Sequence, residues 1–323
     1  MMQVSTQEVA CPICAARVAM NSHFKNGADR IRKCPACSVA FVYPRVSGSE
    51  LLSQYSPNYF RERYDSLQQS EYVNVQSWQK KIAMCLGRVD RLRGAKTGLL
   101  LDVGCGNGWF LEAARKRGWQ VQGVELCPEV AKGTMERVGT QVHIGNIFDV
   151  ELPSETFDLI TMFDVIEHLE APIEALRICY RILRPGGALA LSTPNLLGLG
   201  CRLLGARAFA VWPDEHIIYF GPASMKRALQ LAGFADIEIA SREIYPENAA
   251  TIISRLLGKN GGGTGVLNAA DPGVRSVKNL FRHNPILKGL RRALNGFFGA
   301  VPIGDELLAF ALKQSVVRVG LNT

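Results

Sequence analysis

Short apolar runs alternate with amphipathic stretches through the middle of the chain. The apolar runs predict strands at residues 99–103, 120–125, 141–144, 157–162 and 188–192, and the amphipathic stretches predict helices at 109–117, 128–138, 171–183 and 222–232. Strands that alternate with helices of about 10–15 residues are typical of βαβ units and a parallel sheet covered on both faces. The pattern therefore predicts a doubly wound α/β fold with ligands at the carboxyl ends of the strands.

The flanking regions have a different pattern. Residues 70–93 place apolar side chains on one face of an expected helix, which would pack across the edge of the main domain. Two more strands are expected at 236–240 and 306–313. Between them, GKNGGGTG at 258–265 predicts a flexible break, and residues 275–298 combine apolar and basic positions with amphipathic character.

Composition narrows the class of protein. With 323 residues and 47% apolar content, the chain can bury a substantial core. A membrane span needs about 20 uninterrupted apolar residues, and the best stretch, 196–212, contains Arg202 and Arg207. The first residues lack the basic and apolar regions of a signal peptide. We therefore expect a soluble, cytoplasmic protein.

The net charge of +8 is concentrated at the two ends. Residues 251–323 carry ten Lys and Arg against three Asp and Glu, and residues 1–45 carry six against two, so the centre is mildly acidic. This distribution permits a polyanionic partner but does not require one. Peripheral contact of the basic segment 275–298 with an anionic membrane is one such expectation.

A glycine-rich loop carries the clearest functional signal. Residues 99–110, LLLDVGCGNGWF, place Asp102 at the end of an expected strand and Gly104, Gly106 and Gly108 directly after it. The phosphate-binding Gly-Lys-Ser/Thr pattern is absent, and Trp109 stands where the dinucleotide GxGxxG pattern requires its third glycine. Glu125 ends the next expected strand, where a carboxylate can accept both hydroxyls of a ribose.

Together with three later segments, this loop resembles the class I S-adenosylmethionine-dependent methyltransferases. The later segments are GNIFDVELPSETFDLITMFDVIEHLEAP, RILRPGGALALSTPN and EHIIYFGPASMKRALQLAGF, and the ending GDELLAFALK resembles the last strand of that family. The likeness covers residues 98–240 continuously. It implies a doubly wound, seven-stranded Rossmann-like methyltransferase sheet that binds S-adenosyl-L-methionine.

The resemblance also implies roles for individual residues. Asp102 and the three glycines would hold the methionine part of the cofactor, and Glu125 would hold the ribose. The remaining cofactor contacts would come from residues after the third and fourth strands: Asn146 to the adenine amino group, Ile147 on the ring, and Phe163 with Asp164 facing the cofactor. Asn146 stands where the family usually has aspartate, and its side-chain oxygen can accept the same hydrogen bond.

Two Glu-His pairs are candidates for the chemistry. Glu215 and His216 precede a YF stretch as in sugar C-methyltransferases, and that resemblance makes His216 the expected base with Glu215 in support. The alternative is that His216 only shapes a lid. His168, with Glu167, is a second catalytic candidate. This stretch resembles ubiquinone-biosynthesis O-methyltransferases, in which Asp164, Glu167 and His168 would hold a divalent ion; otherwise His168 caps a helix and Glu167 is solvated.

Four of the nine cysteines form two CxxC pairs separated by 19 residues. Cys11 and Cys14 with Cys34 and Cys37 have the spacing of a zinc ribbon, in which four thiolates close a tetrahedral structural site. A redox role for one pair is the alternative. Such ribbons bind nucleic acid in some proteins, and they also precede sugar-modifying methyltransferases, where they help to cover the substrate.

These patterns divide the chain into a zinc ribbon (1–45), a linker and helical cap (46–97), a methyltransferase core (98–245), a basic insertion (246–302) and a last strand with a tail (303–323). We expect methyl transfer to oxygen or carbon of a small molecule or glycan precursor resembling a nucleotide sugar. The alternatives are a quinone or lipid O-methyltransferase at a membrane, an RNA methyltransferase, and a non-catalytic binding module. STPN at 192–195 is not the signature of amino-methylating enzymes, which disfavours a nucleic acid partner.

Overall fold

The structure is a computed structural model that describes residues 8–20, 23–24, 28–44, 75–94, 96–242, 245, 248–249, 251–253 and 303–314. The expected basic segment 275–298, the break at 258–265 and the start of the expected helix at 70–74 lie outside the described residues.

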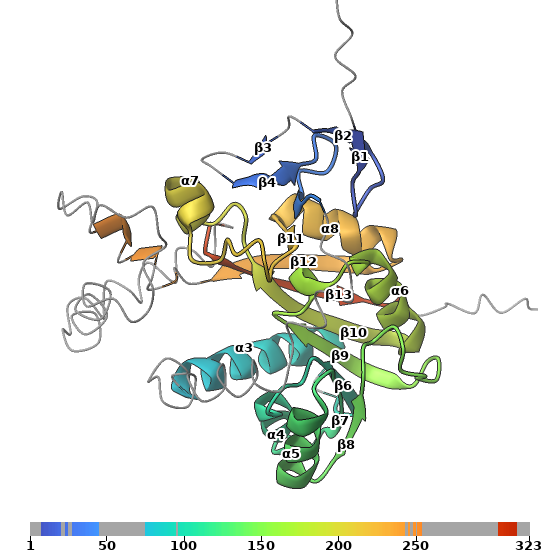
Figure 1. Cartoon of the computed structure of the whole chain (residues 1–323). Helices are drawn as coiled ribbons and strands as arrows, with labels where there is room; N and C mark the ends of the chain where they lie inside the picture. Colours follow the sequence, from blue (N-terminus) through green and yellow to red (C-terminus); the bar gives the residue numbers. More distant parts are fainter. Residues whose placement is uncertain are drawn as a thin grey trace, which may run out of the picture.

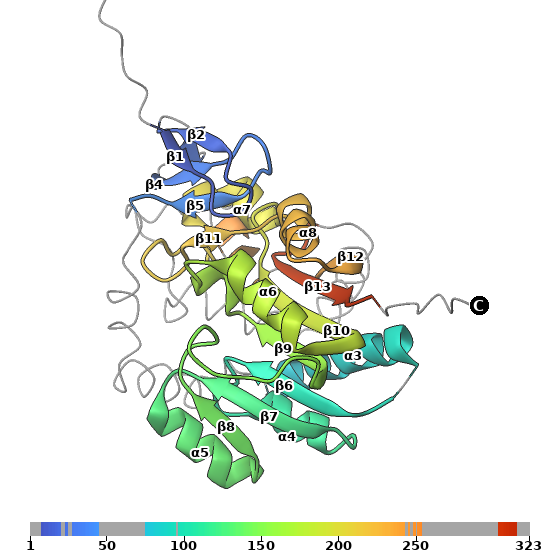
Figure 2. The same cartoon turned by 90° about the vertical axis from the view of Figure 1, so that its right-hand side faces the viewer.

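A seven-stranded sheet forms the centre of the molecule (Figures 1 and 2). Its order is β12-β13-β10-β9-β6-β7-β8; β13 runs antiparallel to both of its neighbours, and the other neighbouring pairs are parallel. The strands are β6 (Leu99–Val103), β7 (Gln120–Glu125), β8 (Gln141–Ile144), β9 (Phe157–Phe163), β10 (Leu183–Pro194), β12 (Ala235–Arg242) and β13 (Glu306–Leu312). The sheet confirms the expected Rossmann-like methyltransferase architecture.

Helices cover both faces of this sheet. On one side lie α3 (Val75–Arg93), α4 (Trp109–Arg115) and α5 (Pro128–Val138), and on the other lie α6 (Pro172–Ile182) and α8 (Pro222–Leu231). The strands supply alternate residues to the two layers: Leu189 and Leu191 pack with α6 and α8, whereas Ala188 and Ala190 pack with α3 to α5. Two apolar layers therefore fix the sheet and the positions of its strand ends.

The expected elements agree with the observed ones except at their ends. Strands β6, β7 and β8 and helix α5 have the expected bounds, whereas β10 begins at Leu183 rather than at Ala188. The pairing of β10 with β9 breaks register between these two residues, where Gly186 adopts φ +77°. The RPGG sequence therefore forms an irregular start to the strand.

The cysteine-rich unit adds two small sheets above the core (Figure 1). The first pairs β1 (Glu8–Ala10) with β2 (Arg17–Ala19). The second has the order β11-β5-β4-β3 and contains β3 (His23–Phe24), β4 (Ala28–Lys33) and β5 (Ala40–Val42). Its fourth strand, β11 (Ile218–Tyr219), belongs to the core, so the two units share one sheet.

Three short helical segments follow strands β9 and β10. A 3-10 turn, η1 (Ile166–His168), follows β9; α7 (Leu199–Leu204) and a second 3-10 turn, η2 (Gly205–Arg207), follow β10. Among the described residues, no helix combines the length and apolar character needed to cross a membrane.

Candidate active site

The glycine loop after β6 adopts a conformation that needs glycine. Gly104 has φ +71°, and a Cβ atom there would lie 2.5 Å from Cγ2 of Val165. Gly108 has φ +69° and begins α4, and its Cβ would lie 2.5 Å from Cγ2 of Thr134. Because side chains at these positions would be both strained and crowded, the close packing of the loop against Val165 and Thr134 requires glycine.

Two buried carboxylates flank this loop. Asp102 accepts a hydrogen bond from Oγ1 of Thr161 at 2.6 Å, and Glu125 accepts the backbone N–H groups of Gly106 at 2.9 Å and Cys127 at 3.0 Å. Each carboxylate residue is 4% exposed. Burial raises the pKa of Asp102 to about 7 and also raises the pKa of Glu125. A cationic, hydroxyl-bearing ligand fits such a pair, because its charge and donors offset the cost of burial.

We predict that cofactor binding depends on the ionisation of Asp102. The ammonium group of S-adenosylmethionine favours the carboxylate, so affinity should rise by about 20-fold between pH 5.5 and 7.5 as Asp102, with a pKa of about 7, loses its proton. In the protein without cofactor, the fold stability depends on pH in the opposite direction. The pKa of Asp102 is higher in the folded than in the unfolded chain, so its protonated form stabilises the fold at low pH, and this contribution is lost as the pH rises through about 7.

Titration calorimetry across this pH range measures the effect. Asp102→Asn should bind more weakly with a flat pH profile. A parallel pH dependence in the wild type and in Asp102→Asn would contradict the prediction.

The other expected cofactor contacts lie along the same edge of the sheet. Phe163, at the end of β9, packs its ring 4.9 Å from that of Phe110, measured between centroids, and is 9% exposed. Ile147 is 2% exposed, and Oδ1 of the neighbouring Asn146 accepts the Phe148 N–H at 3.4 Å. Gly145 N–H donates to the carbonyl of Glu125 at 2.9 Å, which joins the segment after β8 to the end of β7.

A buried lysine, which the sequence interpretation missed, lies beside Asp164. Nζ of Lys81 on α3 lies 3.1 Å from Oδ2 of Asp164, 2.9 Å from Oγ of Ser192, and in an ion pair with Glu306. Burial alone would lower the pKa of Lys81, but the charges of Asp164 and Glu306 outweigh it and raise this pKa. The available signal was a lysine four residues before Cys85, on the apolar stripe of the helix.

Replacing Lys81 with methionine should destabilise the fold by about 3–5 kcal/mol, because the buried carboxylate of Glu306 would lose the counter-charge of Lys81 and the partly exposed Asp164 would lose its ion pair. Equilibrium denaturation in urea measures this loss. Lys116→Met is the matched control, since Lys116 pairs with Glu112 on the exposed surface, and its loss should leave stability nearly unchanged. Equal effects of the two substitutions would contradict the role of the buried network.

The structure brings Glu167, His168 and His216 together. Their ligand atoms lie within 4.8 Å of one another, and the two imidazole centroids are 4.8 Å apart. Nδ1 of His168 lies 2.8 Å from the carbonyl of Glu215, and Nδ1 of His216 lies 2.8 Å from the carbonyl of Ala210. Since a carbonyl only accepts, each Nδ1 carries a hydrogen, which leaves Nε2 as the nitrogen of each ring that can take up a proton or bind a cation.

Glu167 is buried, so the expectation that it is solvated is wrong. It is 1% exposed, and both carboxylate oxygens lack a hydrogen-bond partner among the described residues. Burial, followed by the charge of Asp164, raises the pKa of Glu167 to about 8. His168 ends η1. A buried carboxyl group without a donor is costly, and such groups mark sites that bind a ligand or a cation.

The two Glu-His pairs are arranged differently from the expectation. The backbone carbonyl of Glu215 lies 2.8 Å from Nδ1 of His168, so this residue contacts the imidazole of the other Glu-His pair. The Asp164 side chain lies with Lys81 and Ser192, so His216 takes the third place in the cluster with Glu167 and His168. Ile217, the residue between His216 and β11, donates its N–H to the carbonyl of Glu167 at 2.9 Å, so the two segments meet through a tertiary contact that no spacing along the chain reveals.

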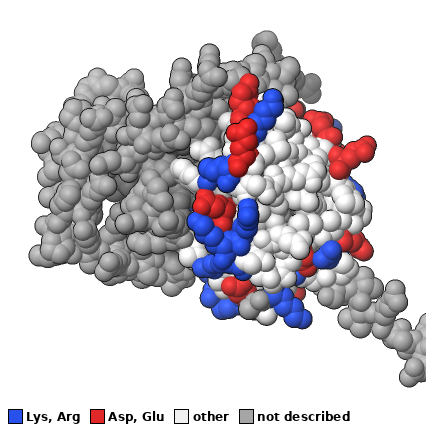
Figure 3. Space-filling model, turned by 90° about the horizontal axis from the view of Figure 1, so that it is seen from below, with Lys and Arg blue, Asp and Glu red and all other residues white. Residues whose placement is uncertain are grey.

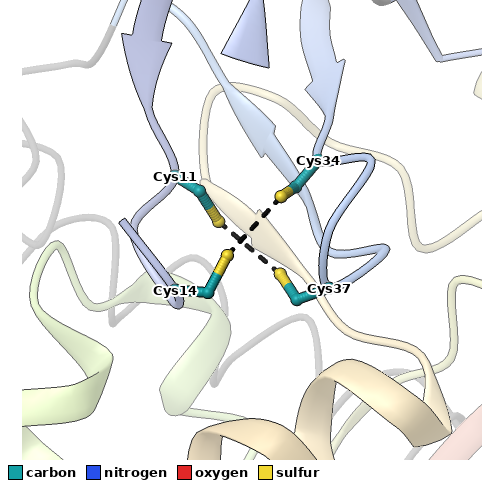
Figure 4. A group of neighbouring side chains, drawn as sticks. All are labelled: Cys11, Cys14, Cys34 and Cys37. Carbon is teal, nitrogen blue, oxygen red and sulfur yellow. Dashed lines mark hydrogen bonds between the residues drawn. The ribbon is translucent and has the colours of Figure 1, made fainter. Parts of the chain in front are cut away.

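The four cysteines of the two CxxC pairs converge as expected (Figure 4). Sγ of Cys11 lies 3.6 Å from that of Cys37, and Sγ of Cys14 lies 3.7 Å from that of Cys34. Zinc–sulfur bonds of about 2.3 Å in a tetrahedron place sulfur atoms about 3.8 Å apart, so the observed spacing fits a zinc ion. Each knuckle closes with a residue at positive φ, Ala15 at +57° and Ser38 at +62°.

Comparison with known proteins identifies the family of the central domain. A family model described as "Methyltransferase domain" matches residues 76–239, a little over half of the chain. A ubiquinone biosynthesis O-methyltransferase of Xanthomonas oryzae pv. oryzae is 35% identical over 132 residues, which are 39% of this chain and 52% of that protein. The enzyme of that name from Xanthomonas euvesicatoria pv. vesicatoria is 33% identical over 186 residues, 51% of this chain and 73% of that protein.

A solved structure shares the fold. Phosphoethanolamine N-methyltransferase 2 of Haemonchus contortus, solved with phosphomonomethylethanolamine and S-adenosylhomocysteine, aligns with a TM-score of 0.52 and 20% identity over 85% of this chain and 62% of that one. The chain spans about half the length of the Xanthomonas oryzae relative. With the sheet order and the glycine loop, the family match shows that the chain belongs to the methyltransferase domain family and has a class I S-adenosylmethionine-dependent methyltransferase core.

Proposed function

We propose that the protein transfers a methyl group from S-adenosylmethionine to a hydroxyl oxygen of a small molecule, with His216 as the base. The observation that carries this proposal is the pair of imidazoles of His168, at the end of η1, and His216, in the segment before β11, each of which donates from Nδ1 to a backbone carbonyl. Both belong to segments that follow the carboxyl ends of β9 and β10, where open α/β sheets bind ligands.

Asp102 and Glu125 would hold the cofactor and His216 would take a proton. S-adenosylmethionine supplies a methyl group whose bond to sulfur breaks as the bond to the acceptor oxygen forms, with the electron pair remaining on sulfur. Nε2 of His216 accepts the hydroxyl proton, and the carbonyl of Ala210 stabilises the resulting imidazolium through Nδ1–H. His168, edge-on to His216, would orient the hydroxyl.

For the acceptor we propose a hydroxylated quinone precursor. The support is the named activity of the relatives, ubiquinone biosynthesis O-methyltransferase, and the half-length match leaves this a proposal. A glycan precursor is the second acceptor class, supported by the cysteine-rich unit packed against β11. Contact with a membrane through 275–298 stays a prediction, because that segment lies outside the described residues.

A labelling experiment tests both the activity and the acceptor. Pure protein is incubated with methyl-labelled S-adenosylmethionine and, in separate reactions, hydroxylated quinone precursors, nucleotide sugars and a fractionated metabolite extract. Mass spectrometry should find an O-methylated quinone precursor. Label on a sugar would overturn the acceptor class, and cofactor binding without labelled product in any reaction would favour the non-catalytic alternative.

An RNA acceptor has less support. On the face seen from below in Figure 1, basic and acidic side chains of the described residues lie close together along one side (Figure 3). A phosphate backbone binds to concentrated positive charge, and its affinity falls steeply with salt. We therefore expect no salt-dependent shift of RNA by the full-length protein at low ionic strength.

A divalent ion held by Glu167, His168 and His216 is a second candidate mechanism. One carboxylate and two imidazoles form a donor set that suits a divalent ion, and the ion would satisfy the unpartnered oxygens of Glu167. When bound, such an ion would lower the pKa of an acceptor hydroxyl. His216 would then be a ligand instead of a base.

Chelation separates the two mechanisms. With His216 as a base, dialysis against EDTA should leave turnover unchanged, whereas a required ion predicts loss and recovery on adding a divalent metal. Zinc content is measured alongside, because the cysteine site should keep its own metal during this treatment. Glu167→Gln is a further test. Adding a divalent metal should fail to restore turnover in this variant only if Glu167 is a ligand of that metal.

We propose that the four cysteines hold a structural zinc ion. Four sulfur ligands leave no position for a substrate, and a unit of this size gains most of its stability from its metal. Elemental analysis of protein purified without added metal should give one zinc per chain, and Cys37→Ser should reduce it. A disulfide between cysteines of the two pairs, seen by intact-mass analysis, would contradict this assignment.

A further inference from the structure

The cysteine-rich unit contacts the core through a strand next to the candidate base. In the antiparallel pair of β5 with β11, Phe41 lies opposite Ile218 and Ala40 opposite Tyr219. The Val42 N–H donates to the carbonyl of Ile217 at 2.9 Å. Ile217 directly follows His216, so this hydrogen bond lies one residue from the imidazole.

Residues 217–220, which include β11, are also hydrogen-bonded to the core. The Ile217 N–H donates to the carbonyl of Glu167 at 2.9 Å, and the Leu196 N–H donates to the carbonyl of Phe220 at 2.7 Å. Residues 217–220 therefore lie between the cysteine-rich unit and the segments that follow β9 and β10. The hydrogen bond to Glu167 also links the backbone next to His168 with that next to His216.

Apolar packing joins the same parts on both faces of the shared sheet. On one face, Phe41 and Val39 pack in the cluster that contains Ile217, Ile218 and Met225. On the other face, Ile31, Ala40 and Val42 pack with Leu196, Val211 and Tyr219. Phe41, Ala40 and Ile31 are at most 1% exposed. Strand β5 is thus buried between core segments on both faces.

The cysteine cluster lies at the start of β5. Cys34 and Cys37 form the knuckle directly before this strand, and the Cys34 N–H donates to the carbonyl of Val39 at 2.8 Å. Cys11 and Cys37 belong to the same apolar cluster as Ile217 and Ile218. Because a small metal-bound unit folds only with its metal, losing the ion would release β5.

We propose that the cysteine-rich unit positions the acceptor side of the active site: its bound zinc holds β5, β5 holds β11, and this strand pair fixes His216 beside His168. The catalytic consequence rests on the function proposed above, whereas the ordering of β11 stands independently of it. The cofactor loop after β6 has no part in this contact, since its hydrogen bonds run to β7 and α5. Zinc loss should therefore slow methyl transfer without preventing cofactor binding.

Hydrogen exchange measured by mass spectrometry tests this coupling in the full-length chain. In Cys37→Ser, amides of 211–220 should exchange at least about 10-fold faster than in the zinc-loaded wild type, while those of 99–108 keep their rates. The dissociation constant for S-adenosylhomocysteine should stay within about twofold, and kcat/KM for the acceptor should fall at least about 10-fold.

A second set of variants leaves the cysteines intact. Val42→Pro removes the N–H donor to Ile217, and Arg30→Ala removes the 2.7 Å ion pair between Arg30 and Asp214 of the core. Arg17→Ala is the matched control, because Arg17 pairs with Glu8 inside the cysteine-rich unit. Val42→Pro should speed exchange of 211–220 at unchanged zinc content, Arg30→Ala should have a much smaller effect because both side chains of its ion pair are exposed, and the control should have none.

The results separate this inference from the proposed function. Unchanged exchange of 211–220 after zinc loss and in Val42→Pro would overturn the positioning role, whatever the activity. If exchange of 211–220 is faster after zinc loss and in Val42→Pro, but His216→Ala keeps full turnover, then His216 is not the base, and the coupling between β5 and β11 still holds. Loss of cofactor binding in Cys37→Ser would also contradict the proposal, because the zinc would then support the whole core.

Discussion

Glu125→Ala is expected to weaken S-adenosylmethionine binding by at least about 100-fold. Two hydrogen bonds from ribose hydroxyls to a charged acceptor contribute about 3–6 kcal/mol together. The substitution also frees the N–H groups of Gly106 and Cys127, which Glu125 accepts at 2.9 and 3.0 Å, so the loop would lose its support. Titration calorimetry measures the loss.

Two variants sharpen this test. Glu136→Ala removes an exposed carboxylate from α5 and should bind like the wild type. Glu125→Gln keeps one acceptor oxygen near the ribose and should fall between the wild type and Glu125→Ala. Wild-type affinity in Glu125→Ala would show that the cofactor's ribose lies elsewhere, and the assignment of the whole glycine loop would be wrong.

His216→Ala is expected to lower kcat by about 100- to 10,000-fold, the range that a positioned general base contributes. Cofactor affinity should be unchanged, since the carboxylates expected to bind the cofactor, Asp102 and Glu125, lie on β6 and β7, whereas His216 precedes β11. Single-turnover measurements with labelled cofactor isolate the chemical step from product release.

His216→Asn is the companion variant, because its amide can keep a hydrogen bond to the carbonyl of Ala210 while it cannot take a proton. Similar losses in both variants would support proton transfer. Recovery of most of the rate in His216→Asn would instead indicate that His216 shapes its surroundings, which is the alternative expected from the sequence.

The fold was predictable because its signals are local. Apolar runs and glycines set the bounds of β6, β7 and α5. Asp102 is the residue before the last of β6 and Glu125 is the last of β7, so both positions follow from the pattern alone. The cysteine cluster was likewise predictable from spacing, since each CxxC turn brings its own two thiolates together.

The acceptor side of the site was less predictable because tertiary contacts build it. Lys81 lies on α3, yet it pairs with Asp164 after β9 and Glu306 on β13. His216 lies beside Glu167 and His168 because the chain just before β11 is hydrogen-bonded to this segment, through the Ile217 N–H and the Glu167 carbonyl. Hydrophobic periodicity predicts which face of a helix or strand is buried, but it does not predict which charged residue from a distant part of the chain will contact that face.

Strand β13 sets the order in which this molecule can be completed during synthesis. It lies between β10 and β12, although the ribosome makes it after both of them. Until β13 inserts, β12 lacks its partner in the described sheet, and the edge of β10 is open to pairing with other chains. Bringing together two strands that are separated by residues 243–305 also carries an entropic cost that slows folding.

The same strand carries Glu306, so a nascent chain that has not reached it lacks one of the two carboxylates that form ion pairs with Lys81. Completion of the buried charge network is thus coupled to completion of translation through this part of the chain. A stalled ribosome would display a formed cofactor loop on an unfinished sheet, a species that we expect chaperones and proteases to recognise by its open strand edge.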